Sequence, residues 1–136
     1  MWKGRWNNAP VAIKKVKLGT DPAAYRHFAR EAQLMCSLQH PNIVTTYGLV
    51  KAPLAIVMEY LALGSLRDRL KSDRFETDQK FEIIEKVCNG MVYLHSLGLV
   101  HRDLAARNIR TFPSFPFLSL TLSSFFFLVL ACYLVV

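Results

Sequence analysis

The spacing of apolar and polar residues changes several times along the first 60 positions of the chain. Residues 10–16 alternate between the two kinds and are rich in β-branched side chains, which predicts a strand. Residues 22–38 have helical spacing, and Asp21 precedes them as an expected N-cap. Two apolar runs, 43–50 and 54–60, then flank Lys51-Ala52-Pro53 and predict a hairpin. The predicted apolar stripe of the helix consists of Phe28, Ala32, Met35 and Leu38.

The pattern from residue 64 to residue 98 is helical. Gly64 and Ser65 open a short charged helix to about Lys71, and a longer helix runs from about Thr77 to Leu97 with Gly98 as its C-terminal cap. The order of strand, helix, two strands and further helices indicates an α+β fold rather than regular βαβ alternation. The predicted apolar side of the longer helix is formed by Phe81, Ile84, Val87, Cys88, Met91 and Leu94.

Composition narrows the class of protein. The 136 residues suffice for one small domain. The net charge of +7 comes from scattered residues without a block of like charges, so we expect no nucleic-acid partner. The three cysteines, Cys36, Cys88 and Cys132, have no paired spacing, which favours a reducing compartment over a disulfide framework or a zinc site. The first residues do not have the pattern of a signal peptide.

Lys14 lies within the first predicted strand, in Val11-Ala12-Ile13-Lys14. A buried ammonium group needs an anionic partner, because burying an isolated charge is costly. Glu31 is the single acidic residue between Pro22 and Leu38 and lies next to the apolar stripe of that helix. The pattern therefore predicts an ion pair between Lys14 and Glu31; the alternative is two ordinary surface charges.

A loop after the longer helix carries a second set of candidate residues, in His101-Arg102-Asp103-Leu104-Ala105-Ala106-Arg107-Asn108. Asp103 could accept a hydroxyl proton and Asn108 could hold a metal ion. This octet resembles the catalytic loop of protein kinases, H-R-D-x-x-x-x-N, and its inner Leu-Ala-Ala-Arg resembles the tyrosine kinase version. The strand motif around Lys14 resembles the kinase V-A-I-K motif and stands in the family's order.

The resemblance implies a partial protein tyrosine kinase domain over residues 1–110. The expected architecture is a kinase-like N-lobe, with an antiparallel sheet and a helix, followed by the first helices of the C-lobe and the catalytic loop. By resemblance Lys14, paired with Glu31, would hold the α- and β-phosphates of ATP. A buried edge strand is the alternative for the predicted hinge at 56–61. The other implied ATP contacts are Ala12, the gatekeeper Met58, the hinge residues Glu59 and Leu61, and Asp68 near the ribose.

The same resemblance assigns roles in phosphoryl transfer to the loop. Asp103 would accept the proton of a protein tyrosine hydroxyl, Arg107 would neutralise charge on the transferred phosphate, and Asn108 would bind Mg²⁺. Arg102 would be a partner for an activation-loop phosphate. The implied partners are therefore ATP and a protein tyrosine substrate, and the implied cofactor is Mg²⁺.

The sequence departs from the family pattern at both ends. Residues 3–6 resemble the second strand of a kinase, and the chain contains neither G-x-G-x-x-G nor Asp-Phe-Gly. Ile109 is followed by Arg110, where the family continues with an apolar residue. We therefore expect no measurable kinase activity from this chain. The alternatives are a non-catalytic fragment that binds another kinase domain, and a chain that does not fold.

The C-terminal region, residues 111–136, forms a separate hydrophobic tail. Residues 117–136 contain no charge, glycine or proline, and their length matches a bilayer span. With Arg107 and Arg110 on the N-terminal side, a membrane segment would leave the kinase-like part in the cytoplasm. The alternative origin of the tail is read-through sequence or a mistaken gene model. Burial in a core is the least favoured interpretation, because nothing charged or turn-forming breaks the run.

Overall fold

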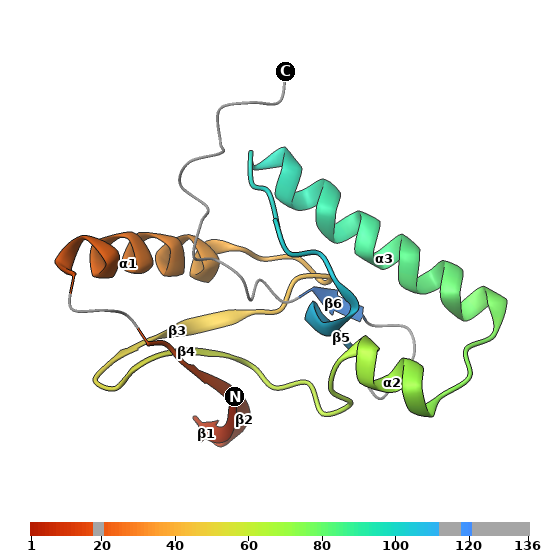
Figure 1. The fold of residues 1–136 in the computed structure, drawn as a ribbon, viewed down its shortest axis with the longest axis horizontal. Helices are drawn as coiled ribbons and strands as arrows, with labels where there is room; N and C mark the ends of the chain where they lie inside the picture. The colour runs from red at the N-terminus through yellow and green to blue at the C-terminus, as the bar shows by residue number, and fades with distance from the viewer. Residues whose placement is uncertain (18–20, 112–117, 121–136) are drawn as a thin grey trace. The chain divides into compact units, whose positions relative to one another are not determined.

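The computed structural model describes residues 1–17, 21–111 and 118–120 (Figure 1). The chain divides into two compact units. The first consists of Met1–Gln39 and Thr45–Tyr60, and the second of His40–Val44 and Leu61–Val136.

The first unit contains an antiparallel sheet of four strands in the order β1-β2-β4-β3. These strands are β1 (Trp2–Trp6), β2 (Ala9–Lys15), β4 (Leu54–Glu59) and β3 (Thr46–Lys51). Asn7 and Asn8 connect β1 to β2 with φ values of 48° and 62°. Positive φ at both central residues is the requirement of a type I′ two-residue hairpin turn, and asparagine tolerates it. The Asn-Asn pair was therefore a hairpin signal that the pattern analysis did not use.

Helix α1 (Pro22–Ser37) packs against β3 in this unit (Figure 1). Its start confirms the predicted cap, because the Asp21 carboxylate accepts the N–H of Ala23 at 2.8 Å and Pro22 occupies the first turn. All four residues of the predicted stripe are buried, which confirms the face of the helix that was expected to pack: Phe28, Ala32, Met35 and Leu38.

The predicted hairpin is confirmed as β3 and β4, but β3 begins at Thr46 rather than near Ile43. The N–H of Ile43 instead donates to the carbonyl of His40 at 3.0 Å, in a turn. Ile43 and Val44 are buried in the second unit. The apolar run at 43–50 therefore contributes residues to both units, and its composition alone did not indicate the boundary between Val44 and Thr45.

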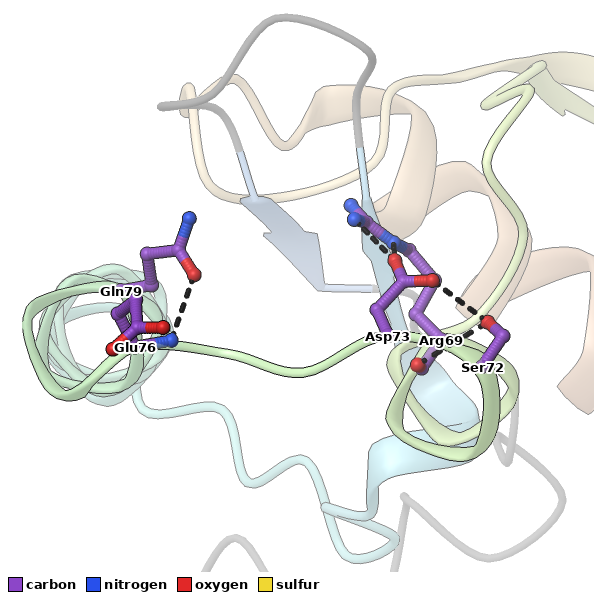
Figure 2. A network of polar contacts seen from close by, with 5 residues as sticks. All are labelled: Arg69, Ser72, Asp73, Glu76 and Gln79. Carbon is purple, nitrogen blue, oxygen red and sulfur yellow. Dashed lines mark hydrogen bonds and ion pairs between the residues drawn. The ribbon is translucent and has the colours of Figure 1, made fainter.

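The second unit contains α2 (Leu66–Ser72), α3 (Thr77–Ser96), a 3₁₀ turn η1 (Ala106–Asn108), and β5 (Ile109–Thr111) paired with β6 (Leu118–Leu120). Polar contacts fix the end of α2, where the Asp73 carboxylate accepts Nε of Arg69 at 2.6 Å and the Ser72 hydroxyl at 2.9 Å (Figure 2). The Ser72 hydrogen bond and then the Arg69 guanidinium lower the pKa of Asp73. At the start of α3 the N–H of Glu76 donates to Oε1 of Gln79 at 2.9 Å (Figure 2).

Helix α3 ends in a Schellman motif. The N–H of Gly98 donates to the carbonyl of His95, and the N–H of Leu99 donates to the carbonyl of Leu94, both at 2.9 Å. Gly98 has φ 71°, a left-handed conformation that other residues adopt at a cost. The predicted role of Gly98 is confirmed.

The predicted apolar side of α3 is wrong. Phe81 and Ile84 are 67% and 57% exposed, and Cys88 is exposed as well. Val87 and Met91 are half-buried, and of the predicted set Leu94 alone is buried. The helix carries two apolar stripes, 83-87-90-94 and 81-84-88-92, with equally good helical spacing. Periodicity cannot choose between them, and the fold buries the first, with Ile83, Gly90 and Leu94 inside.

The predicted membrane segment, 117–136, lies outside the described residues except for 118–120, which form β6. Among the helices that the structure describes, none combines the length and apolarity needed to cross a bilayer.

Candidate active-site loop and nucleotide-binding strands

The loop between α3 and η1 begins with a tight turn around Arg102. The N–H of Asp103 donates to the carbonyl of His101 at 2.8 Å, and it lies 3.3 Å from Nδ1 of the same histidine. Arg102, the central residue, has φ 58°, which is uncommon for a residue other than glycine. His101 is buried, so its ring and carbonyl form a fixed base for the turn. The turn therefore sets the direction in which Asp103 leaves the backbone.

The Asp103 carboxylate is held from two sides. The Arg107 guanidinium forms an ion pair with Oδ1, and Nδ2 of Asn108 donates to Oδ2 at 2.8 Å. The same Nδ2 also donates to the Asp103 backbone carbonyl at 2.7 Å. The turn η1 brings residues four and five positions along the chain back to Asp103, and the N–H of Asn108 closes it on the carbonyl of Ala105 at 2.8 Å.

Burial differs sharply among these three residues. Asn108 is 5% exposed, whereas the side chains of Asp103 and Arg107 are 25% and 53% exposed. A buried amide therefore anchors a carboxylate that still reaches solvent. The predicted residues Asp103, Arg107 and Asn108 are brought together by the structure as one cluster.

The strands of the first unit bring a second set of predicted residues onto one sheet. In the register of β2 with β4, Ala12 lies opposite Met58 and Lys14 lies opposite Ile56. Because side chains alternate along a strand, Ala12, Lys14 and Met58 share one face of the sheet. Ala12 and Met58 are buried and Lys14 is half-buried.

Glu31 is half-buried on α1, immediately before the buried Ala32, and belongs to the same unit as Lys14. This position at the margin of the packed face agrees with the place that the sequence pattern predicted for it. The ion pair itself stays a prediction.

The predicted hinge coincides with the boundary between the two units, which falls after Tyr60. The N–H of Glu59 donates to the carbonyl of Thr45 at 2.9 Å, which extends the β3–β4 pairing by one step. The carbonyl of Leu61 accepts the N–H of Gly64 at 3.4 Å in the turn that leads to α2. The alternative interpretation of the predicted hinge segment as an edge strand is wrong for β4, because β4 lies between β2 and β3.

Asp68 lies in the first turn of α2 and takes part in the cap of that helix. The Ser65 hydroxyl donates to its carboxylate at 2.5 Å and accepts its N–H at 3.2 Å. The Ser65 hydrogen bond is the main reason why the pKa of Asp68 is lowered. Its side chain is 61% exposed. The pattern analysis did not identify this capping role, although a serine three residues before an aspartate is its sequence signal.

The candidate metal ligand Asn108 has one acidic neighbour in the cluster, Asp103. Within residues 1–17, 21–111 and 118–120 there is no group of three or more His, Cys, Asp or Glu residues that could hold a metal ion. A magnesium ion at Asn108 would therefore depend on oxygen ligands from a bound phosphate, which is how Mg²⁺ usually binds in such sites.

A helix-bearing antiparallel sheet, followed along the chain by two helices and a loop with an oriented carboxylate, is consistent with the N-lobe and part of the C-lobe of a protein kinase. The family model for protein tyrosine and serine/threonine kinases matches residues 1–111, and the chain belongs to this family. The antiparallel sheet and the helices that follow it confirm the expected α+β class and the N-lobe with a partial C-lobe.

Three relatives illustrate the similarity. Tyrosine-protein kinase FRK of Homo sapiens is 40% identical over 116 residues, which cover 80% of this chain and 22% of FRK. A probable serine/threonine-protein kinase of Dictyostelium discoideum is 36% identical over 118 residues, or 79% of this chain and 9% of that protein. Cytoplasmic tyrosine-protein kinase BMX of Mus musculus is 42% identical over 111 residues, or 79% of this chain and 16% of BMX. The chain thus spans less than a quarter of the length of each relative.

Proposed function

We propose that this chain carries the ATP-binding strands and the catalytic loop of a protein tyrosine kinase, and that the 136-residue chain by itself does not transfer phosphate. The observation that carries the proposal is the Asp103 carboxylate held by Arg107 and by the buried Asn108. The similarity to tyrosine kinases such as FRK and BMX agrees with the tyrosine kinase form of the loop.

In this proposal Asp103 orients a tyrosine hydroxyl and accepts its proton. The clamp by two donors keeps the carboxylate in one rotamer, so the acceptor oxygen is positioned before the substrate arrives. Arg107 is exposed enough to approach the transferred phosphoryl group, whose negative charge it would neutralise.

Asn108 would hold magnesium through its side-chain oxygen. Its Nδ2 already donates twice to Asp103, and Mg²⁺ takes oxygen ligands, so Oδ1 would be the ligand atom. ATP bound with Mg²⁺ supplies the γ-phosphoryl group of the reaction. The amide therefore links the orientation of the base to the position of the metal.

The sheet of the first unit binds the nucleotide. Lys14 contacts the phosphates and is held by Glu31, while Ala12 and Met58 line the adenine. The register that places Ala12 opposite Met58, with Lys14 on the same face, supports this assignment. Backbone groups of Glu59 and Leu61 bond adenine at the hinge, and Asp68 contacts the ribose.

The expected inactivity follows from residues that phosphoryl transfer requires and this sequence does not contain. There is no Gly-rich phosphate loop and no Asp-Phe-Gly metal motif, so positioning and charge neutralisation are both incomplete. In β5, the half-buried Arg110 takes the position of an apolar residue, and the next residue, Thr111, is buried without a hydrogen-bond partner for its hydroxyl among the described residues. Arg110 therefore departs from the family pattern at a position where the resemblance expects an apolar residue.

The kinase-like part is proposed to act in the cytoplasm. The relative BMX is called a cytoplasmic kinase, and the unpaired spacing of the three cysteines agrees with a reducing compartment.

The test uses a radiolabelled phosphate-transfer assay with a tyrosine-containing peptide. The purified 136-residue chain should give no signal above that of its Asp103→Asn variant; a signal that depends on Asp103 would contradict the expected inactivity. A chimera tests the assigned roles separately. Residues 1–109 replace the matching part of FRK behind the N-terminal strand and phosphate loop of FRK, and the FRK sequence continues after Ile109, so that Arg110 is not carried over.

The chimera should phosphorylate the peptide. Asp103→Asn should lower its rate by about 10²–10⁴-fold, the usual contribution of a general base. A chimera that binds ATP and retains its rate after Asp103→Asn would refute the role of this carboxylate. Ser96→Ala, on the exposed end of α3, is the matched control and should leave the rate unchanged.

A further inference from the structure

Helix α3 has an exposed apolar stripe that no described residue covers. Phe81 and Val92 are each 67% exposed and Ile84 is 57% exposed, and Cys88 lies between them on the same side of the helix. Their spacing of three, four and four residues makes a continuous row about 17 Å long at a rise of 1.5 Å per residue. Contiguous apolar surface of this kind marks a docking site more often than a solvated face.

The course of the chain after β5 leads to this helix. Strand β6 pairs with β5 and packs against α3. Residues 121–136 follow β6 directly and contain no charged residue, glycine or proline. A segment of this length spans about 24 Å as a helix and about 50 Å when extended, so either form reaches along the whole stripe.

We propose that residues 121–136 dock on the stripe formed by Phe81, Ile84, Cys88 and Val92 of the same chain. The stripe and the segment are both uncharged, so burial of apolar surface drives the contact. Because β6 already holds the start of the segment on α3, the contact is intramolecular, with an effective concentration of about a millimolar. A second copy of the chain at micromolar concentration cannot compete with that. The segment thereby completes the second unit.

Cys88 provides a direct reporter, because it lies within the stripe. The double variant Cys36→Ser, Cys132→Ser leaves Cys88 as the single thiol of the full-length chain. Its rate of reaction with a maleimide follows the exposure of the thiol. We expect this rate to rise about tenfold or more when Phe126→Asp and Leu128→Asp are added, since the charges would displace the docked segment.

The matched control moves the single thiol to the first unit. A chain with Cys88→Ser and Cys132→Ser retains Cys36, which is half-buried on α1. The same two aspartates should leave the reaction rate of Cys36 unchanged. A rise at both cysteines would mean that the aspartates unfold the chain, so the cross-link below then decides.

The cross-link uses the Cys36→Ser chain, which retains Cys88 and Cys132. A short bismaleimide should join these two thiols within one chain and give a monomeric product. The proposal is overturned if Cys88 reacts at the same rate with and without the aspartates while the cross-link does not form. It is also overturned if protection grows with protein concentration, which indicates a second copy, or appears only with phosphatidylcholine vesicles, which indicates a membrane-bound segment.

Discussion

Replacing Asn108 by alanine should destabilise the second unit more than the same change at the neighbouring Arg107. Asn108 is 5% exposed, and its Nδ2 forms two hydrogen bonds with Asp103, one to the backbone carbonyl and one to the carboxylate. The substitution removes both bonds and leaves Asp103 without the donor that fixes its rotamer.

The size of the effect follows from those two bonds. A hydrogen bond between neutral groups contributes about 1 kcal/mol, and one to a charged group contributes about 1.5–3 kcal/mol. Because the Asp103 side chain is 25% exposed, water replaces part of the loss, so we expect Asn108→Ala to cost about 2–3 kcal/mol. Arg107→Ala removes an ion pair whose cation is 53% exposed, and such pairs contribute about 0.2–1 kcal/mol.

Urea unfolding followed by circular dichroism measures both changes. With a typical slope of about 1–3 kcal/mol per molar urea, Asn108→Ala should lower the midpoint by about 1 M or more, and Arg107→Ala by a few tenths of that. Equal shifts for the two variants would show that the buried amide is not the anchor of the loop. An unchanged midpoint for Asn108→Ala would refute the reasoning altogether.

Three further predictions concern the frame around the site. Gly98→Ala should cost about 1–2 kcal/mol because Gly98 has φ 71°, although a Cβ there would meet no atom within 4 Å. Gly48 also has open space but no positive φ, so Gly48→Ala is the control. A urea midpoint of Gly48→Ala as low as that of Gly98→Ala would contradict the argument. Leu94→Ala should cost about 2–5 kcal/mol in urea unfolding, because Leu94 is 1% exposed. The same change at Leu70, which is 53% exposed, should be nearly neutral. Similar costs for the two variants would show that α3 packs through another face. The lowered pKa of Asp73 means that its ionised form stabilises the fold above its ordinary pKa of 3.8 and that this stabilisation is lost as pH falls through the lowered pKa. Asp73→Asn should therefore be less stable than the unchanged chain at pH 7 and equal to it near pH 2, and a constant difference across that range in thermal melts would refute the assignment.

Features that depend on neighbouring residues could be predicted from the sequence. The Asp21 cap and the Gly98 turn each satisfy backbone groups within a few positions, so residue type and order suffice to find them. The buried stripe of α1 could be predicted equally well, because that helix carries a single apolar face. The octet at 101–108 pointed to Asp103, Arg107 and Asn108, and the structure brings these three together.

Features that depend on the choice of a packing partner could not be predicted in the same way. Helix α3 has two apolar stripes of equal spacing, and the predicted set mixed residues of the exposed stripe with Val87 and Leu94 of the buried one. Asp68 was assigned to a nucleotide by resemblance, yet its nearest interaction is with Ser65 in a helix cap. The nucleotide contact of Asp68 and the pairing of Lys14 with Glu31 therefore stay predictions that rest on the family resemblance.

The sequence by itself determined the α+β order of elements, the ends of the helices and the membership of the kinase family, because local hydrogen bonds and motif spacing are written in consecutive residues. Tertiary structure alone decided which side of α3 is buried and that β4 lies between β2 and β3. Those outcomes depend on the free energy of burying one surface against another, and that energy is set by residues far apart in the chain.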